Sequence, residues 1–202
     1  MVFKIGEKMN PLIKEELFSL ETYSEKREEF KAQVLSEKKN RRVQIGEHIT
    51  LLFENKNTIQ YQIQEMLRIE KIFEADGIKE ELDAYNPMIP TGTNLKATML
   101  IEYEDVSERK IRLTQLKGVE TQIWLKAGSS NKVFPIADED LERENETKTS
   151  AVHFLRFEFN ADQIKEFKSG GSVMVGSDHE NYQTPDAILP QETRLALAKD
   201  FE

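Results

Sequence analysis

Strand-type segments follow one another along this sequence in hairpin-like pairs, and helix-type segments interrupt them at irregular intervals. The longest predicted strand is Ser150–Phe159, where apolar side chains occupy alternate positions. Two further strands, Gln122–Ala127 and Lys132–Ala137, are joined by the turn-type residues Gly128–Asn131. This order lacks a regular strand–helix alternation, so it predicts an α+β fold: a mainly antiparallel sheet with irregularly inserted helices.

The helices are marked by capping residues and by apolar side chains at helical spacing. The clearest helix opens at Asn57, because Gln60 follows three residues later as in a capping box. It is predicted to extend to about Phe73 and to bury a stripe made of Ile59, Ile63, Met66, Leu67 and Phe73. The other predicted helices cover residues 21–39 and 78–85 and begin at Asp105, Asn160 and Pro190.

The chain has 202 residues, which is long enough for one domain with a substantial core. Proline and glycine gather between Tyr85 and Asn94, and we interpret this stretch as a loop inside a single domain of residues 21–202. Residues 1–20 form a predicted N-terminal arm, since their apolar side chains follow no regular period. We expect the arm to pack on a second copy of the chain as well as on its own domain, because exposed apolar residues are unfavourable. Its apolar residues are Phe3, Ile5, Leu12, Ile13, Leu17 and Phe18.

Composition excludes several kinds of chemistry. The sequence has no cysteine, no glycine-rich phosphate loop and no GxSxG motif, so we predict no thiol chemistry, no serine nucleophile elbow and no cofactor. The net charge of −9 argues against a nucleic-acid partner, because such binding depends on cations that neutralise phosphates. No apolar run approaches about 20 residues and charges interrupt the N-terminus, so we expect a cytoplasmic protein without a membrane segment.

A polar turn follows the last predicted strand and reads SDHENY. Its histidine has acidic neighbours, a combination that can bind a divalent metal or act as an acid–base pair. The alternative is an ordinary polar turn whose aspartate caps local backbone amides. The candidate polar site consists of Asp178, His179 and Tyr182, with His153 nearby.

His153 belongs to the strand Ser150–Phe159 and shares a face with Leu155 and Phe157. A histidine on such a face is either a hydrogen-bonded core residue or a ligand. One short helix joins this strand to the strand that ends at Val175, so both strands could lie in the same sheet. Antiparallel pairing there would bring His153 close to His179.

A glutamine-rich face lies on the helix that is predicted to begin at Asn57. Gln60, Gln64 and Arg68 share this face at intervals of four residues. Uncharged amide groups suit a recognition surface for another protein, whereas the alternative is a solvated helix face.

Two charged segments each leave more than one interpretation open. Lys38, Lys39, Arg41 and Arg42 suit the last turn of a helix, where cations complement the helix dipole, or an anion contact. The acidic stretch Asp138–Glu146 suits a solvated turn, a docking patch for a basic partner or loose cation binding. It lacks the glycine of a calcium loop.

Three blocks of the sequence resemble the signature segments of an uncharacterised bacterial family known as a domain of unknown function. They read TLLFENKNTIQYQIQEMLRIEKIFE, ELDAYNPMIPTGTNLKATMLIEYED and ADEDLERENETKTSAVHFLRFEF, and the resemblance extends from about Leu17 to the C-terminal helix. One position differs, because Glu180 stands where the family has a proline. The resemblance implies that the gene for this protein lies beside genes for rubrerythrin-like iron proteins and an iron–sulfur oxidoreductase. Such a gene neighbourhood implies an accessory role in redox or peroxide handling. It carries over no catalytic residues.

Two functions are therefore predicted. The first is a non-catalytic accessory or protein-interaction domain that self-associates and binds another cytoplasmic protein. It rests on the missing catalytic motifs, the glutamine-rich face and the apolar arm. The alternative is a metal-dependent or small-ligand enzyme with its site at Asp178, His179 and Tyr182.

Overall fold

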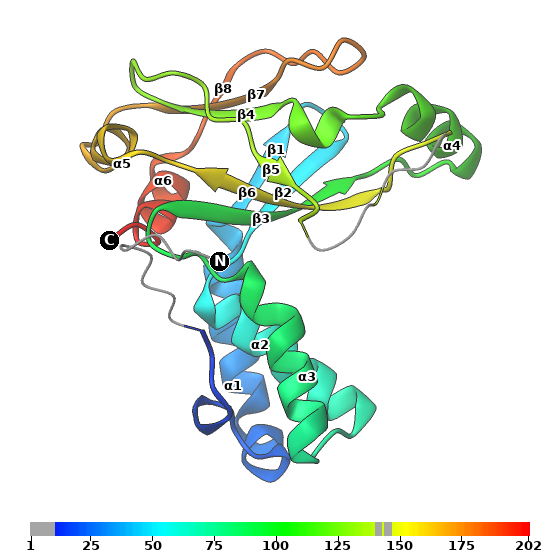
Figure 1. Ribbon diagram of the computed structural model, residues 1–202, viewed down its shortest axis with the longest axis vertical. Coiled ribbons are helices and arrows are strands. Elements are labelled where there is room, and N and C mark those ends of the chain that lie inside the picture. The colour runs from blue at the N-terminus through cyan, green and yellow to red at the C-terminus, as the bar shows by residue number, and fades with distance from the viewer. Residues whose placement is uncertain (1–10, 140–142, 144–146) are drawn as a thin grey trace, which may run out of the picture.

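The computed structural model describes residues 11–139, 143 and 147–202, and its strands form two antiparallel sheets (Figure 1). Within this described part, a five-stranded sheet has the order β1-β2-β3-β6-β5 and a three-stranded sheet has the order β4-β7-β8. The arrangement confirms the predicted α+β fold in a single domain. The strands are β1 (Arg42–Ile45), β2 (Ile49–Phe53), β3 (Asn94–Ile101), β4 (Ile123–Ala127), β5 (Ile136–Ala137), β6 (Val152–Glu158), β7 (Val173–Ser177) and β8 (Ala187–Ile188).

The helices are inserted between the strands at irregular intervals, as the sequence predicts. No helix in the described ranges is long and apolar enough to span a membrane. The α-helices are α1 (Leu20–Lys39), α2 (Lys56–Glu70), α3 (Ala75–Tyr85), α4 (Val106–Gln115), α5 (Ala161–Lys168) and α6 (Gln191–Ala198). Short 3₁₀ turns are η1 (Lys14–Glu16), η2 (Asn86–Met88) and η3 (Val119–Thr121).

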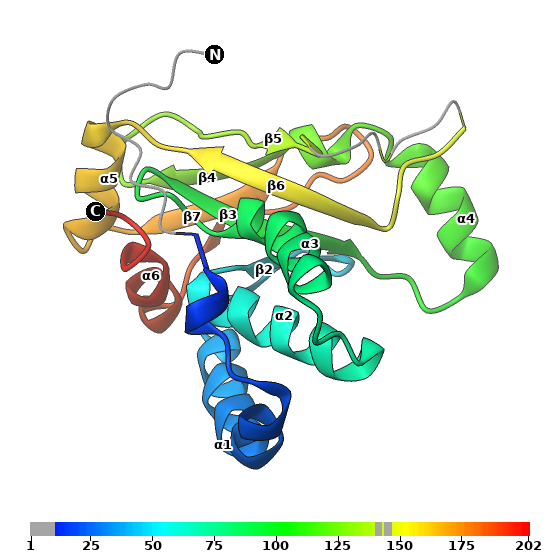
Figure 2. The ribbon, with the colours of Figure 1, turned by 60° about the horizontal axis from the view of Figure 1, so that its bottom comes forward.

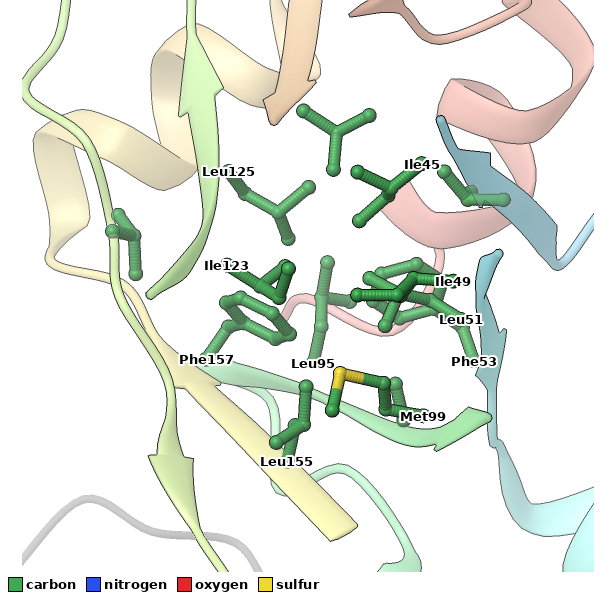
Figure 3. Packing of buried hydrophobic residues seen from close by; sticks show 14 of the residues in the cluster. Ile45, Ile49, Leu51, Phe53, Leu95, Met99, Ile123, Leu125, Leu155 and Phe157 are labelled. Atoms are coloured by element: carbon green, nitrogen blue, oxygen red, sulfur yellow. The ribbon is translucent and has the colours of Figure 1, made fainter. Parts of the chain in front are cut away.

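The main hydrophobic core lies between the two sheets, where alternate residues of each strand point inward (Figure 3). On β3 the inward residues are buried, while Lys96 and Thr98 between them are half-buried on the opposite face. The two faces of the five-stranded sheet therefore have different roles. The labelled core residues in Figure 3 are Ile45, Ile49, Leu51, Phe53, Leu95, Met99, Ile123, Leu125, Leu155 and Phe157.

Near the C-terminus, α5 and α6 close the core with a cluster of aromatic rings. Phe159, Phe167 and Phe201 pack edge to face, with ring centroids 5.2–5.9 Å apart. Beside them the buried Arg41 forms hydrogen bonds of 2.7 and 2.8 Å to both carboxylate oxygens of Asp200. This pair fixes the end of α6 to the segment between α1 and β1.

The first three helices form a separate unit below the sheets in Figure 1. Its own apolar cluster includes Leu12 from the arm and Ile59, Ile63 and Leu67 from α2. The described part of the predicted arm, residues 11–20, thus packs on this chain, and residues 1–10 lie outside the described residues. Figure 2 shows α3 beside the outer face of β3 and β6.

Local structure departs from the sequence predictions at both ends of α2. The N-cap is Asn55 and not Asn57, because the Asn55 side chain accepts a hydrogen bond from the Thr58 amide and the Asn55 amide donates the reciprocal bond to the Thr58 hydroxyl oxygen. Threonine therefore completes the box in place of glutamine. The helix ends at Glu70, with Lys71 in the left-handed conformation, so Phe73 lies beyond it and is 68% exposed.

The strand predictions also need correction. The strand that carries His153 is not the longest, since β6 has seven residues and β3 has eight. From Lys132 to Ala137, Val133 forms an isolated bridge with Leu125, and a strand forms only over Ile136–Ala137. The strands β6 and β7 do not share a sheet, because α5 carries the chain from one layer of the fold to the other.

Candidate functional site

Asp178 directly follows β7 and is bound by Trp124 of β4 and by Lys132. Its Oδ1 accepts hydrogen bonds from the Trp124 indole at 2.8 Å and from the Lys132 ammonium at 2.7 Å. Lys132 also lies 4.2 Å from the centroid of the Trp124 ring. The hydrogen bond from Lys132 lowers the pKa of Asp178, so this carboxylate is stabilised as an anion.

His179 and Tyr182 are buried and hold neighbouring segments of backbone. The Nε2 atom of His179 is 2.9 Å from the carbonyl oxygen of Lys117. The Tyr182 hydroxyl donates to the carbonyl oxygen of Ile45 at 2.6 Å and accepts from the amide of His48 at 2.9 Å. These contacts tie the turn to the β1–β2 hairpin and to the end of α4.

His153 lies in the five-stranded sheet, so the expectation of one sheet containing both histidine-bearing segments is wrong. Its ring is completely buried, with Nδ1 2.6 Å from Asp138 Oδ2 and Nε2 2.9 Å from the Thr149 hydroxyl. Asp138 adopts a φ of 50° and also accepts a hydrogen bond from the Phe154 amide at 2.9 Å. His153 thus has a partner set of its own, separate from that of His179. Among the residues the structure describes, no group of three or more His, Asp or Glu side chains could hold a metal ion.

The glutamine-rich face of α2 is covered by residues 16–18 of the same chain. Gln64 is completely buried, and its Oε1 accepts a hydrogen bond from the Phe18 amide at 2.6 Å. Gln60 donates to the carbonyl oxygen of Glu16 at 2.7 Å, while Arg68 contacts Glu65 at 3.3 Å. The expectation of an open or recognition face is wrong for Gln64, which belongs to the fold itself.

The two charged segments are placed as follows. Lys38 and Lys39 occupy the last turn of α1, which confirms the helix-terminus interpretation for them. Arg41 is buried against Asp200, a role that neither interpretation of the basic stretch included. Most of the acidic stretch, residues 140–142 and 144–146, lies outside the described residues.

A cleft of about 600 Å³ lies between α3 and the outer face of β3 and β6, and sequence reasoning did not identify it. We call it the α3 cleft. Its apolar lining includes Met66 of α2, Tyr85 of α3, Met88 of η2 and Phe154 of β6. Its charged side chains are Glu54, Glu81, Asp83, Lys96, Glu139 and Arg156.

Most charged groups of the α3 cleft already have partners. The Arg156 guanidinium binds Glu139 through two hydrogen bonds of 2.7 and 2.8 Å, and it binds Glu158 at 2.6 Å. The hydrogen bonds from Arg156 lower the pKa of Glu139. The Lys96 ammonium donates to the carbonyl oxygen of Pro87 at 2.6 Å. This end of the cleft is therefore fixed by a network of paired groups.

Glu81 differs from the other charged groups of the cleft. Its Oε2 atom is buried and has no hydrogen-bond partner. Burial raises the pKa of Glu81, and the nearby carboxylates of Glu70 and Glu80 raise it further. A buried acceptor without a partner is unfavourable by roughly 1–3 kcal/mol, so its presence beside a cleft indicates a site for a donor.

The α3 cleft continues past Lys96 and Arg156 into a second hollow of about 670 Å³ that ends at Pro11 and Leu12. Two other hollows lie away from the α3 cleft. One of about 740 Å³ lies beside α5 and the C-terminal Glu202. Another of about 370 Å³ contains Arg41, whose charge is already balanced by Asp200.

The comparisons with known proteins give a family and no activity. No curated protein matches the sequence. A crystal structure described as a novel protein of unknown function from Burkholderia pseudomallei K96243 is similar, with 46% sequence identity and a TM-score of 0.89. The alignment covers 95% of this chain and 99% of that one. Residues 11–201 match the family DUF3501, described as a protein of unknown function. The chain therefore belongs to the DUF3501 family.

Proposed function

We propose that this protein is a non-catalytic binding protein that takes a small organic molecule in the α3 cleft. The observation that carries the proposal is a cleft of about 600 Å³ with a buried, unpartnered carboxylate oxygen at its side. This volume lies within the roughly 300–1,000 Å³ that is usual for ligand pockets. Such pockets combine an apolar lining with a few polar groups that set the orientation of the ligand.

Binding would draw its free energy from the apolar lining of the cleft. Tyr85 and Phe154 offer aromatic surface, and Met66 and Met88 offer flexible thioether side chains that adapt to ligand shape. The paired Arg156 and Glu139 would hold the sheet side of the cleft rigid. A preformed wall reduces the entropy that is lost on binding.

The enzyme alternative at the Asp178–Tyr182 turn has weaker support. The Asp178 carboxylate and the Tyr182 hydroxyl are engaged with protein donors and acceptors, and His179 Nε2 faces a carbonyl oxygen. A catalytic acid or base needs a proton-transfer atom within reach of the substrate. We therefore place the proposed ligand at the α3 cleft and not at this turn.

The proposed function is tested by blocking the cleft. Ala84 lines it and is exposed, so Ala84→Trp would fill the cleft, while Ala32→Trp on the exposed face of α1 is the matched control. The probes are 2-phenylethylamine, 2-phenylethanol and 3-phenylpropionate, titrated into labelled protein and followed by amide NMR shifts. We expect saturable shifts around Tyr85, Met88 and Phe154 with one or more probes, lost in Ala84→Trp and kept in Ala32→Trp. Absence of saturable shifts at these residues, or shifts unchanged in Ala84→Trp, would refute the proposal.

A second candidate is the protein-interaction role that the sequence predicts, with a second copy of the chain as partner. The observation that favours it is the exposed apolar end of the α2–α3 hairpin, where Ile69 is 60% exposed and Phe73 is 68% exposed. With this candidate we also propose the accessory role in redox or peroxide handling and the cytoplasmic location that are expected from the sequence analysis. Light scattering on the Ile69→Lys/Phe73→Lys variant tests it: a lower apparent mass than that of the unchanged protein is expected, and an equal mass contradicts it.

A further inference from the structure

We propose that the ligand of the α3 cleft carries an ammonium group on an apolar body, and that Glu81 binds this group. The inference rests on the proposed function, because it requires that the cleft holds a ligand. It adds the chemical class of the ligand and the residue that recognises it.

The first observation is the state of the Glu81 side chain. Its Oε2 is buried and unpartnered, and Glu81 is one of the residues by which α3 lines the cleft. Carboxylate oxygens accept hydrogen bonds when ionised, and a bond from a charged donor is roughly twice as strong as a neutral one. An ammonium group supplies both the missing donor and the opposite charge.

The second observation is that the cations of the cleft are already engaged. Arg156 is hydrogen bonded to Glu139 and Glu158, and Lys96 to the Pro87 carbonyl. An anionic ligand would have to displace these partners, whereas a cationic ligand would not.

The third observation is the excess of acidic groups around the cleft. Its lining contains four carboxylates, Glu54, Glu81, Asp83 and Glu139, against the two cations Lys96 and Arg156. Asp83 is bound by Lys79, and the Glu54 oxygens accept hydrogen bonds from the Thr58 and Thr98 hydroxyls. The net charge of −9 of the whole chain also favours a cationic ligand over an anionic one.

The remaining walls define the rest of the ligand. Met66, Tyr85, Met88 and Phe154 surround the space next to the charged groups. They offer contact area to a hydrocarbon or aromatic body of about the size of a phenylethyl group. A fully hydrophilic amine would leave these surfaces without apolar contacts.

The test compares probes that differ in one functional group. 2-Phenylethylamine and 2-phenylethanol have the same body, while 3-phenylpropionate carries the opposite charge. At pH 7.5 and low salt, we expect the amine to bind the unchanged protein at least tenfold more tightly than the alcohol, and the carboxylate to bind most weakly. Calorimetry or NMR titration measures all three dissociation constants.

Variants assign the effect to Glu81. In Glu81→Gln, we expect the amine to bind within about twofold of the alcohol, whose own affinity stays unchanged. The matched control is Glu80→Gln, an exposed carboxylate on the same helix that does not line the cleft. Circular dichroism verifies that each variant is folded, and the amine-to-alcohol ratio in the unchanged protein tests the inference without any variant.

The outcomes separate the two proposals. Equal binding of amine and alcohol that is lost in Ala84→Trp would overturn the ammonium assignment and support the cleft as a binding site. Preferred binding of the carboxylate, or an amine preference that survives Glu81→Gln, would also overturn the assignment. Absence of binding by all three probes would count against the cleft and the assignment together.

Discussion

Glu81 carries a stability disadvantage in the free protein. Because its pKa is raised in the folded state, the folded protein disfavours the ionised carboxylate relative to the unfolded chain. The unfavourable contribution of the ionised carboxylate to folding is fully present above the raised folded-state pKa. It shrinks between the two pKa values, where the folded state binds more protons than the unfolded chain. It disappears as the pH falls below the unfolded pKa. A group that is unfavourable for stability and lines a cleft fits a functional role.

We predict that Glu81→Gln increases the free energy of unfolding by about 1 kcal/mol at pH 7.5, because it removes a poorly solvated charge. The gain should shrink at pH 4, where Glu81 of the unchanged protein is largely protonated. Urea denaturation at both pH values measures the effect. Glu80→Gln should give a smaller gain at pH 7.5, because it removes only one of the two carboxylates that raise the pKa of Glu81. A Glu81→Gln variant that is less stable at pH 7.5 would contradict the prediction.

Gln64 shows why the α2 face could not be interpreted from sequence. A glutamine at helical spacing from Gln60 is compatible with solvent, with a partner or with burial, since the helical period does not specify what covers a face. Here residues 16–18 cover it, and the amide of Gln64 bonds both the N–H and the carbonyl of Phe18. The partners of Glu65 on α1 are not predictable for the same reason. Glu65 binds Tyr23 and Arg27, and the hydrogen bond from Arg27 lowers the pKa of Glu65 to about 2.

Gln64→Ala should therefore reduce the free energy of unfolding by roughly 1–3 kcal/mol, because it leaves two backbone groups of Phe18 without partners. Ile63→Ala on the same helix should cost roughly 2–5 kcal/mol, since Ile63 is completely buried. Met66→Ala should cost less than Ile63→Ala, because Met66 is half-buried and lines the cleft. Chemical denaturation ranks the three variants, and a neutral Gln64→Ala would contradict the structural role.

At the scale of the element, the sequence predicts a helix N-cap where every partner of the capping side chain is close to it in sequence. Asp105 and Asn160 cap α4 and α5 as expected, because the side chain that caps and the amide that it binds are three residues apart. The start of α2 was misplaced by two residues because Asn55 and Asn57 are equally good caps in sequence. The second partner of Asn55, Glu37 of α1, is distant in sequence and could not be foreseen.

The two asparagines provide a direct comparison. Asn55→Ala should reduce the free energy of unfolding by about 1 kcal/mol, because it removes the cap of α2. Asn57→Ala should stay within about 0.5 kcal/mol of the unchanged protein, since Asn57 is exposed and only bonds Glu37 at its surface. Thermal and urea unfolding of both variants provide the test. A larger loss from Asn57→Ala would contradict the assignment of the cap.

At the scale of the whole molecule, the sequence predicts the α+β fold class but does not predict which of the two sheets each strand joins. The alternation along β6 specifies one apolar face, and so does that of β7, but neither pattern says which sheet the strand joins. The short helix α5 packs against the end of the core and passes the chain to the other layer. The α3 cleft has the same origin, because it exists only where the helical unit faces the outer surface of β3 and β6. No stretch of sequence contains such a site.

Self-association is the prediction that concerns the whole molecule. Two deletions of different length are needed to test the arm, because Leu12 is bound to its own chain. Its backbone forms two hydrogen bonds to the Asn86 side chain, at 2.8 and 3.0 Å. Deletion of residues 1–10 keeps this anchor and removes the apolar Val2, Phe3 and Ile5. We expect the truncated protein to stay folded and to show a lower mass in light scattering than the full chain, and its melting temperature should fall only by the stabilisation that association supplies.

Deletion of residues 1–18 is the comparison that separates folding from association. It also removes Leu12 from the apolar cluster of the helical unit and the Phe18 backbone from its bonds to Gln64. We therefore expect a melting temperature lower by several degrees, whatever the oligomeric state, because a loss of about 1 kcal/mol shifts the melting temperature of a domain of this size by roughly 2–4 °C. If the full chain and the chain without residues 1–10 have the same mass, the arm does not mediate self-association. The exposed apolar end of the α2–α3 hairpin would then be the surface to test for a second copy.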